Sequence, residues 1–343
     1  MKKAAVVVLL LAGVAAVAGE AGIMDGFGNF VADVQAEDEL PDNEKAQNES
    51  EEVTGEEEDS ASKIDTSITI GTGSRIAVVS KATDGEYWKL VRQGMEDAVK
   101  DINKAYEFSS DDEISMTFEG PSDEQDIETQ VNTLDAVIAE NPTVLCMSAG
   151  DIESCQAQLE AASENGIPVV VFDSNVRDDE LVAAFRGTDN AYAGKLAAEK
   201  IVDAIGENGK IAVFSAQEKT ESSQKRVEGF EEALADYEGI SIVRELYTDK
   251  VKDMSGAMAD VLKRYPDLDG VFCTNEDVAD MYLGLDKGEN TPVMVGVDAT
   301  SVQQKAITDG QELGTVSQDP YDIGYQTIIA TAQAMSTDPA QAA

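Results

Sequence analysis

Two aspartates each follow directly on a short apolar run, and this placement could bind a small polar molecule. Residues 170–173 read Val-Val-Phe-Asp, and residues 295–298 read Val-Gly-Val-Asp. In open α/β sheets, ligands bind outside the carboxyl ends of the strands, where a carboxylate can accept hydrogen bonds from a ligand. The sequence therefore predicts a cleft for a hydroxyl-rich ligand, with Asp173 and Asp298 as acceptors. For Asp173, a cap on the turn that follows the strand is the alternative.

The elements that would position these aspartates alternate between strand and helix from residue 75 onward. β-Branched runs predict strands at 75–80, 113–118, 143–148 and 168–173, and helical spacing lies between them at 87–104, 124–140 and 152–165. The rhythm restarts with strands at 210–215, 240–247, 269–273 and 293–297 and helices at 190–206, 222–237, 253–264 and 276–286. The pattern predicts two α/β lobes with Rossmann-like parallel sheets, joined by a hinge.

The lobe boundary is predicted between Thr188 and Asp189, where a strand ends in small and polar residues before a helix. The first lobe is expected to comprise residues 75–188 and 319–343. The second lobe is expected to comprise residues 189–318.

Composition narrows the class of function. The chain has 343 residues, 68 Asp and Glu against 25 Lys and Arg, a formal net charge of −43 and no histidine. Such a charge repels phosphate backbones, which argues against nucleic-acid binding. Without histidine, the usual general base and the commonest transition-metal ligand are missing. The sequence therefore predicts a binding protein that is not an enzyme and that uses no cofactor or metal. A hydrolase with Asp173 and Asp298 as paired carboxylates is a rival that no other catalytic motif supports.

The amino-terminal residues predict export. Residues 1–36 are expected to form a signal peptide or an N-terminal anchor, because two lysines precede a small and apolar run that is short for a membrane span. Cleavage could follow Ala18 or Ala36, and an uncleaved anchor is the alternative. Residues 37–74 are acidic, with few bulky apolar side chains, and predict a disordered linker. The expected location is periplasmic or at the cell surface, outside the cytoplasmic membrane.

Three cysteines, Cys146, Cys155 and Cys273, form an odd set in a chain predicted to be exported, so no disulfide framework is implied. Cys146 and Cys273 lie in apolar runs typical of strands. Buried thiols are expected, and a nucleophile is the alternative.

A series of segments carries a family resemblance. In order, they are Arg-Ile-Ala-Val-Val-Ser at 75–80, Glu-Tyr-Trp at 86–88, and the stretches 166–173, 187–190, 226–230, 270–275, 295–298 and 307–310. Together they resemble the ribose-binding-protein branch of periplasmic solute receptors, from about residue 75 to about residue 329. The resemblance implies two lobes joined by a three-stranded hinge, with a monosaccharide bound between the lobes and handed to an ABC importer.

The resemblance also implies ligand-binding roles. Tyr87 and Trp88 match two aromatic residues that sandwich the sugar ring, and core packing is the alternative. Asp173 and Asp298 match family carboxylates that bind sugar hydroxyls. Asn275 matches the family's asparagine, and Gln318 matches a hinge glutamine or asparagine. Both amides could instead be helix caps.

The chain departs from the family pattern in three places. Ser174 and Gln224 are expected where ribose binders carry arginines, which predicts a site without those cationic donors and makes ribose itself doubtful. Family members also continue through a third hinge crossing beyond the point where this chain ends at Ala343, so a truncated fragment is expected.

The predicted function is a monomeric, extracytoplasmic receptor that closes on a monosaccharide or polyol and delivers it to a membrane ABC permease. The sequence leaves open which sugar or polyol is bound. A sensing receptor that feeds a chemoreceptor or sensor kinase is the alternative. The ligand-binding half of a lac-repressor-like transcription factor is disfavoured, because an apolar run and acidic residues stand where a basic helix-turn-helix is required.

Overall fold

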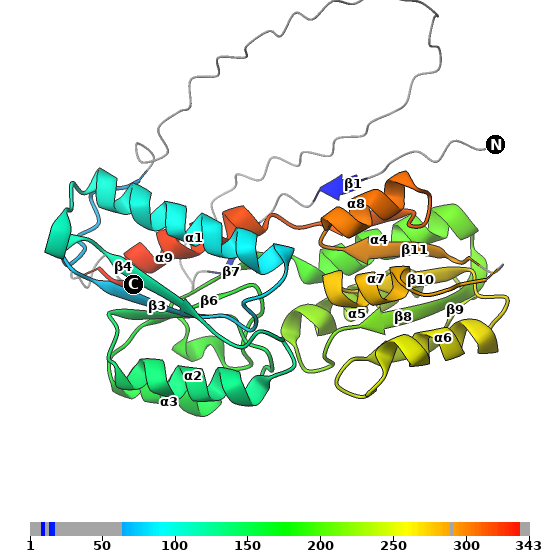
Figure 1. Ribbon diagram of the computed structural model, residues 1–343, viewed down its shortest axis with the longest axis horizontal. Helices are drawn as coiled ribbons and strands as arrows, with labels where there is room; N and C mark the ends of the chain where they lie inside the picture. The colour runs from blue at the N-terminus through cyan, green and yellow to red at the C-terminus, as the bar shows by residue number, and fades with distance from the viewer. Residues whose placement is uncertain (1–7, 11–13, 18–63, 289–290, 337–343) are drawn as a thin grey trace, which may run out of the picture.

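The computed structural model describes residues 8–10, 14–17, 64–288 and 291–336 and divides them between two α/β lobes (Figure 1). Each lobe is built on a six-stranded sheet, and all neighbouring strands run parallel except for one antiparallel edge pair. The predicted fold class, two lobes with parallel sheets, is confirmed.

The first lobe has the strand order β2-β7-β6-β5-β3-β4. Its strands are β2 (Val14–Val17), β3 (Arg75–Val79), β4 (Ser115–Glu119), β5 (Val144–Met147), β6 (Val169–Phe172) and β7 (Ala184–Thr188). Helices α1 (Glu86–Ala105) and α9 (Pro320–Ala334) cover one face, and α2 (Ile127–Ala139) and α3 (Gln156–Glu164) cover the other (Figure 1). Short 3-10 helices, η2 (Ser110–Asp112) and η3 (Asp179–Leu181), lie in its connections.

The second lobe repeats this plan with the order β1-β12-β11-β10-β8-β9. Its strands are β1 (Val8–Leu10), β8 (Asn208–Ser215), β9 (Gly239–Tyr247), β10 (Gly270–Cys273), β11 (Val293–Val297) and β12 (Gly314–Ser317). One face is covered by α4 (Asn190–Ile205) and α5 (Glu221–Leu234). The other packs on α6 (Met254–Arg264) and α7 (Glu276–Leu283), with α8 (Ser301–Thr308) beside α7.

The central strands are continuous apolar runs because helices cover both faces of each sheet. All residues of β5, β6 and β10 are buried, as expected for strands with no solvent-facing side. The core consequently separates into four hydrophobic clusters, two in each lobe. This packing fixes the carboxyl ends of the strands, where the site residues lie.

Glycines allow one helix pair in each lobe to approach closely. A Cβ atom on Gly94 of α1 would lie 2.0 Å from the Tyr321 carbonyl oxygen of α9. In the second lobe, a Cβ atom on Gly194 of α4 would lie 1.9 Å from the Arg226 carbonyl oxygen of α5. Only glycine fits such contacts without a shift of the backbone, so both pairs depend on it.

Apart from the passage from β1 in the second lobe's sheet to β2 in the first, the described chain crosses between the lobes at two adjacent places. One crossing runs from β7 to α4, and the other runs from β12 back to α9 in the first lobe. The Thr188 hydroxyl of the first crossing donates to the Gln318 side-chain oxygen of the second at 2.6 Å. The two crossings are therefore tied together at the hinge.

The amino-terminal predictions meet the structure in part. Strands β1 and β2 fall inside the residues predicted as signal peptide or anchor, and residues 18–63 lie outside the described part. The predicted linker is wrong at its C-terminal end, because Ile64, Ile68 and Ile70 pack on the first lobe's core. No helix within the described residues is long and apolar enough to span a membrane.

Candidate ligand site between the lobes

Asp173 and Asp298 occupy equivalent positions in the two lobes. Asp173 follows β6 and its N–H donates to the Arg186 carbonyl at 2.8 Å, while Asp298 follows β11 and its N–H donates to the Val316 carbonyl at 3.0 Å. Both have left-handed backbones, with φ of 59° and 97°. Such a conformation is strained for a non-glycine residue, although aspartate tolerates it better than most. Both strand-terminating carboxylates line one interlobe cavity.

We call this the inner cavity. It has a volume of about 20 Å³ and is lined by Lys81, Tyr87, Trp88, Glu124, Asp173, Ala216, Ser222, Ser223, Arg226, Asn275, Glu276, Asp298 and Gln318. Residues of both lobes contribute, at the carboxyl ends of strands and the amino-terminal ends of helices. The space admits only a water or two in this state.

The Asp173 carboxylate is held by neighbours from its own lobe, and its Oδ1 atom, which among the described residues accepts only from Tyr87, can accept a further hydrogen bond. The carboxylate accepts from the Tyr87 hydroxyl at 2.7 Å and lies 3.0 Å from the Lys81 ammonium and 2.8 Å from the Ser174 hydroxyl. Burial would raise the pKa of Asp173, but the charge of Lys81 and the Tyr87 hydrogen bond outweigh it and hold the pKa below its usual value. Asp173 is therefore a buried anion.

Lys81 supplies a buried cation that the sequence analysis did not predict. The residue follows β3, is 5% exposed, and its ammonium lies 3.7 Å from the Glu124 carboxylate as well as 3.0 Å from that of Asp173. Burial opposes the charge, yet the two carboxylates raise the pKa of Lys81 above its usual value. The ammonium also reaches the Ser222 hydroxyl of the second lobe at 3.4 Å.

Arg226 supplies the second buried cation. Its Nε donates to the Asn190 side-chain oxygen at 2.8 Å, and its Nη1 donates to the Thr274 carbonyl at 2.6 Å. These bonds fix the guanidinium, and among the described residues no partner is recorded for Nη2. Arg226 therefore holds donors ready at the cavity wall. The expectation that cationic donors are missing is wrong.

Asp298 is held by the second lobe and the hinge. It accepts from the Glu276 N–H at 2.6 Å and from the Gln318 side-chain amide. Burial raises the pKa of Asp298, and the neighbouring Arg226 charge opposes this. Because Gln318 also accepts from Thr188, it links the hinge crossing to the carboxylate.

The two aromatic side chains do not form a sandwich. The Tyr87 and Trp88 rings meet edge to face, with centroids 5.1 Å apart and an interplanar angle of 83°. A sugar ring cannot lie between rings in direct contact. Both side chains are buried in the first lobe's core, and the Trp88 indole N–H donates to the Glu124 carboxylate at 3.1 Å. Each also lines the inner cavity, so packing and site roles coincide.

The structure brings together most of the predicted site residues. Tyr87, Trp88, Asp173, Asn275, Asp298 and Gln318 line the inner cavity. Ser174 lies behind Asp173, fully buried, and is not part of the wall. Gln224 is half-buried and does not reach the cavity. Arg226, two residues further along α5, lines it instead. Asn275 is both a cap and a wall residue, because its side-chain oxygen accepts from the Val278 N–H at 3.2 Å.

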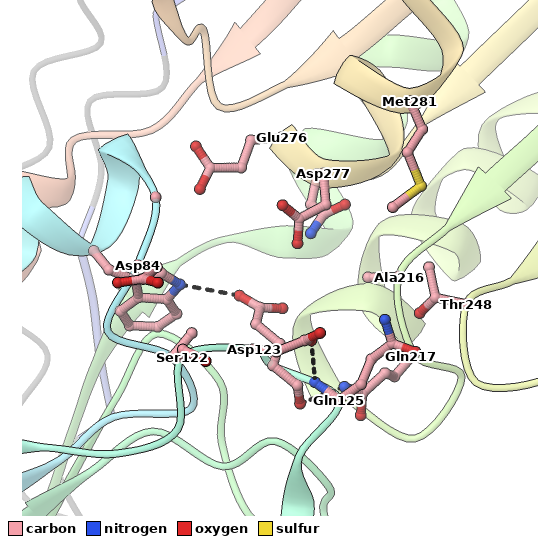
Figure 2. Close-up of a pocket in the computed structure, with 15 residues that line it drawn as sticks. Asp84, Ser122, Asp123, Gln125, Ala216, Gln217, Thr248, Glu276, Asp277 and Met281 are labelled. Carbon is pink, nitrogen blue, oxygen red and sulfur yellow. Dashed lines mark hydrogen bonds between the residues drawn. The ribbon is translucent and has the colours of Figure 1, made fainter. Parts of the chain in front are cut away.

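A second and larger space adjoins the first, and we call it the outer cavity (Figure 2). Its volume is about 240 Å³, and it shares Trp88, Glu124, Ala216, Asn275 and Glu276 with the inner cavity. Asp84 and Asp123 of the first lobe and Glu276 and Asp277 of the second line it from opposite sides (Figure 2).

Crowded carboxylates shift the titration of this region. Burial raises the pKa of Glu124 to about 7; the charge of Lys81 opposes this rise, and the charge of Asp277 adds to it. Burial together with the charges of Asp298 and Asp277 raises the pKa of Glu276 to about 8. Near neutral pH these two carboxyl groups are therefore partly protonated, which reduces the negative charge gathered between the lobes.

The cysteines take no part in this site. All three thiols are free and buried. Burial raises the pKa of Cys146 and of Cys155 to about 12, which disfavours the reactive thiolate. Among the described residues, no group of three or more acidic or cysteine side chains is arranged to hold a metal ion.

The fold and the site define a two-lobed small-molecule receptor whose binding groups come from both lobes. A family model described as "Periplasmic binding protein domain" matches residues 76–338. The chain belongs to this family, which consists of solute-binding proteins and not enzymes.

Individual relatives are similar to most of the two-lobed part. The chain is 26% identical over 205 residues to the ribose import binding protein RbsB of Escherichia coli (strain K12), covering 58% of this chain and 68% of that protein. It is 27% identical over 263 residues to the D-allose-binding periplasmic protein of the same organism, covering 72% and 80%. A solved ABC transporter solute-binding protein from Agrobacterium vitis with bound D-fucose has a TM-score of 0.69, 28% identity and coverage of 76% and 89%.

Proposed function

We propose that this protein captures a monosaccharide or related polyol between its lobes and delivers it to an ABC importer. The observation that carries the proposal is the convergence of Asp173, Arg226, Asn275, Asp298 and Gln318 on one interlobe cavity. Carboxylates accept hydrogen bonds from sugar hydroxyls, while guanidinium and amide groups donate to them. The wall can therefore bind a hydroxyl group both as a donor and as an acceptor. The relatives named for ribose and allose and the structure holding D-fucose support this ligand class.

Capture requires the lobes to open. The inner cavity holds only a water or two, which is far too little for a sugar ring. Several contacts join the lobes directly in this state: the Thr220 hydroxyl donates to the Gly150 carbonyl at 2.6 Å, and the Ile152 N–H donates to the Lys219 carbonyl at 3.0 Å. A ligand that bridges Asp173 and Asp298 would favour the closed arrangement by contacts it cannot make when the lobes are apart.

The remaining parts of the proposal concern location and assembly. The protein acts outside the cytoplasmic membrane, in the periplasm or at the cell surface, and works as a monomer. The relatives named as periplasmic proteins support the location. A closed receptor presents surfaces of both lobes to the permease, which can then distinguish loaded from empty protein.

Binding is tested on the full chain by calorimetry and thermal unfolding with D-fucose, D-ribose, D-allose and D-arabinose. We expect at least one sugar to bind and to raise the melting temperature, because a ligand of the folded state stabilises it by mass action. Asp298→Asn and Arg226→Met should each weaken that sugar at least tenfold, which corresponds to one lost charge-assisted hydrogen bond.

Asp309→Asn serves as the matched control, since it removes an exposed carboxylate from the same lobe away from the cavity. Its sugar affinity should equal that of the unmodified protein. A folded protein that binds none of the four sugars and no related polyol would contradict the proposed function.

A further inference from the structure

Carboxyl groups line the outer cavity on both of its faces. Its wall includes five carboxylates, Asp84, Asp123, Glu124, Glu276 and Asp277. No lysine or arginine of the described chain lines it. The nearest buried cation, Lys81, is already paired with Glu124 and Asp173. Closing the lobes therefore brings like charges together around an open space, which opposes closure unless a cation or protons neutralise them.

Two buried amides also leave polar atoms available at this cavity. Asn275 is 8% exposed, and its side-chain oxygen is occupied by the Val278 N–H at 3.2 Å, so its NH₂ group is left over. Gln217 is 5% exposed, and its NH₂ group donates to the Glu124 carbonyl, so its side-chain oxygen is left over. Neither atom has a recorded partner within the described residues. Both side chains are more than nine-tenths buried and line the cavity, so water or a ligand inside the cavity has to satisfy these two atoms.

The leftover atoms match one kind of ligand. The Gln217 oxygen, the Asp277 carboxylate and the second oxygen of Asp123 are acceptors, since Asp123 Oδ1 already accepts from the Gln125 N–H at 2.9 Å, whereas the Asn275 NH₂ group is a donor. Acceptors with excess negative charge suit an ammonium group, which has three donors and no acceptor. A donor close by suits a hydroxyl or ring oxygen. The cavity of about 240 Å³ adjoins the inner cavity and shares Trp88 and Glu124 with it, so the amino group and the hydroxyl groups of one ligand would lie in neighbouring spaces.

We propose that the outer cavity is a subsite for a positively charged amino group, and that the protein prefers an amino sugar to the neutral parent sugar. The inference rests on the proposed function, because the inner cavity must still hold the hydroxyl groups. Asp123 of the first lobe and Asp277 of the second line the cavity on opposite sides and contribute most to the preference (Figure 2). The ammonium group bridges them and thereby favours closure.

The test compares matched pairs of probes on the full chain by calorimetry, with Trp88 fluorescence as a second readout, since it is the only tryptophan. The pairs are D-glucosamine with D-glucose, D-galactosamine with D-galactose, and D-mannosamine with D-mannose. In at least one pair the amino sugar should bind about tenfold more tightly or better, as expected for a cation held near carboxylates. The N-acetylated form, which has the bulk without the charge, should lose this advantage.

Variants locate the effect. Asp123→Asn and Asp277→Asn should each reduce the ratio between amino and parent sugar at least threefold, while the affinity for the parent sugar stays unchanged. Both side chains are exposed, so neither change should prevent folding. Asp280→Asn is the matched control, because it lies on the same helix but does not line the cavity. Its ratio should stay close to that of the unmodified protein.

The outcomes separate the two proposals. Neutral sugars that bind as tightly as their amino counterparts in all three pairs would overturn the subsite while leaving the sugar receptor intact. A preference that survives in both Asp123→Asn and Asp277→Asn would also overturn it. Absence of binding by every amino, neutral and N-acetylated probe, and by the four sugars above, would overturn both proposals.

Discussion

The buried ammonium of Lys81 offers the sharpest test of how the site is held together. We consider Lys81→Met, which keeps an unbranched apolar side chain one atom shorter than that of lysine but removes its charge. In the structure the ammonium lies 3.0 Å from the Asp173 carboxylate and 3.7 Å from that of Glu124, and the residue is 5% exposed. The substitution therefore leaves one fully buried carboxylate and one largely buried carboxylate without their nearest cation.

The magnitude follows from the distances and the burial. At an effective dielectric constant of ~20, unit charges 3 Å apart attract by about 5 kcal/mol, and desolvation of the ammonium offsets part of this. Removing one partner of a buried ion pair typically costs about 3–5 kcal/mol, because the other charge stays buried and unpaired. We expect the free energy of unfolding to fall by this amount at pH 8, and the melting temperature to fall by roughly 10 °C.

The loss should depend on pH in a defined direction. In the unmodified protein the pKa of Asp173 lies below its usual value, so its contribution to stability is present above that usual value and declines as the pH falls. In Lys81→Met, burial becomes the main influence and raises the pKa of Asp173 and further raises that of Glu124, already about 7. Protonation of these groups then stabilises the variant, so its deficit should shrink between pH 8 and pH 5.

Denaturant unfolding at pH 8 and pH 5 measures this directly. Lys225→Met is the matched control, because Lys225 forms an exposed pair with Glu228 at 2.8 Å and its loss should cost under about 1 kcal/mol at either pH. A Lys81→Met deficit no larger than that of Lys225→Met, or one that grows toward pH 5, would refute the role of Lys81 as a buried counter-ion.

Two other predictions concern lobe closure and helix packing. Glu86 accepts from the Ser301 N–H at 3.0 Å across the lobes, so Glu86→Gln should weaken sugar binding about fivefold by calorimetry while leaving unfolding within about 0.5 kcal/mol. Glu96→Gln, on the same helix without an interlobe contact, should change neither, and equal sugar affinities for the two variants would contradict the assignment. Gly194→Ala places a Cβ atom 1.9 Å from the Arg226 carbonyl oxygen and should cost about 2 kcal/mol or more in urea unfolding, because the backbone must move. An alanine variant as stable as the unmodified protein would show that α4 and α5 can separate without loss.

Much of the fold was predictable because its elements have strong periodic signals. Strands covered on both faces are uninterrupted apolar runs, which are easy to recognise in a sequence. The strands predicted at 143–148 and 168–173 appear as β5 and β6. The helix predicted at 87–104 appears as α1, whose buried residues recur at helical spacing. By contrast, α8 and β12 were not predicted as separate elements. They have only eight and four residues, which is too few to show a clear hydrophobic periodicity.

The site was predictable where a side chain terminates a strand, and less so on helices. Asp173 and Asp298 could be placed because a strand end fixes both position and direction. Gln224 was predicted where Arg226, two residues further along, lines the cavity. A short motif on a helix shows which residues face the cavity only when the position of each residue around the helix axis is known. The spacing of Arg226 from Ser222 and Ser223 places all three on one helical face, which is the signal that would have found it. Lys81 lies two residues after β3 and directly after the strand predicted at 75–80, so the strand-end argument used for Asp173 would have indicated it.

The repeated geometry of the two aspartates is the structural basis of the coupling that we propose between closure and binding. Each carboxylate is turned into the cavity by a left-handed residue at the end of a strand, with φ of 59° in one lobe and 97° in the other. Lys81 is the main cation that lowers the pKa of Asp173, and Arg226 contributes to this and also opposes the raised pKa of Asp298. Lys81 pairs within its own lobe, so that charge balance survives opening. Arg226 and Asn275 keep donors free for whatever enters, and a ligand that satisfies them together with both aspartates is bound best when the lobes meet.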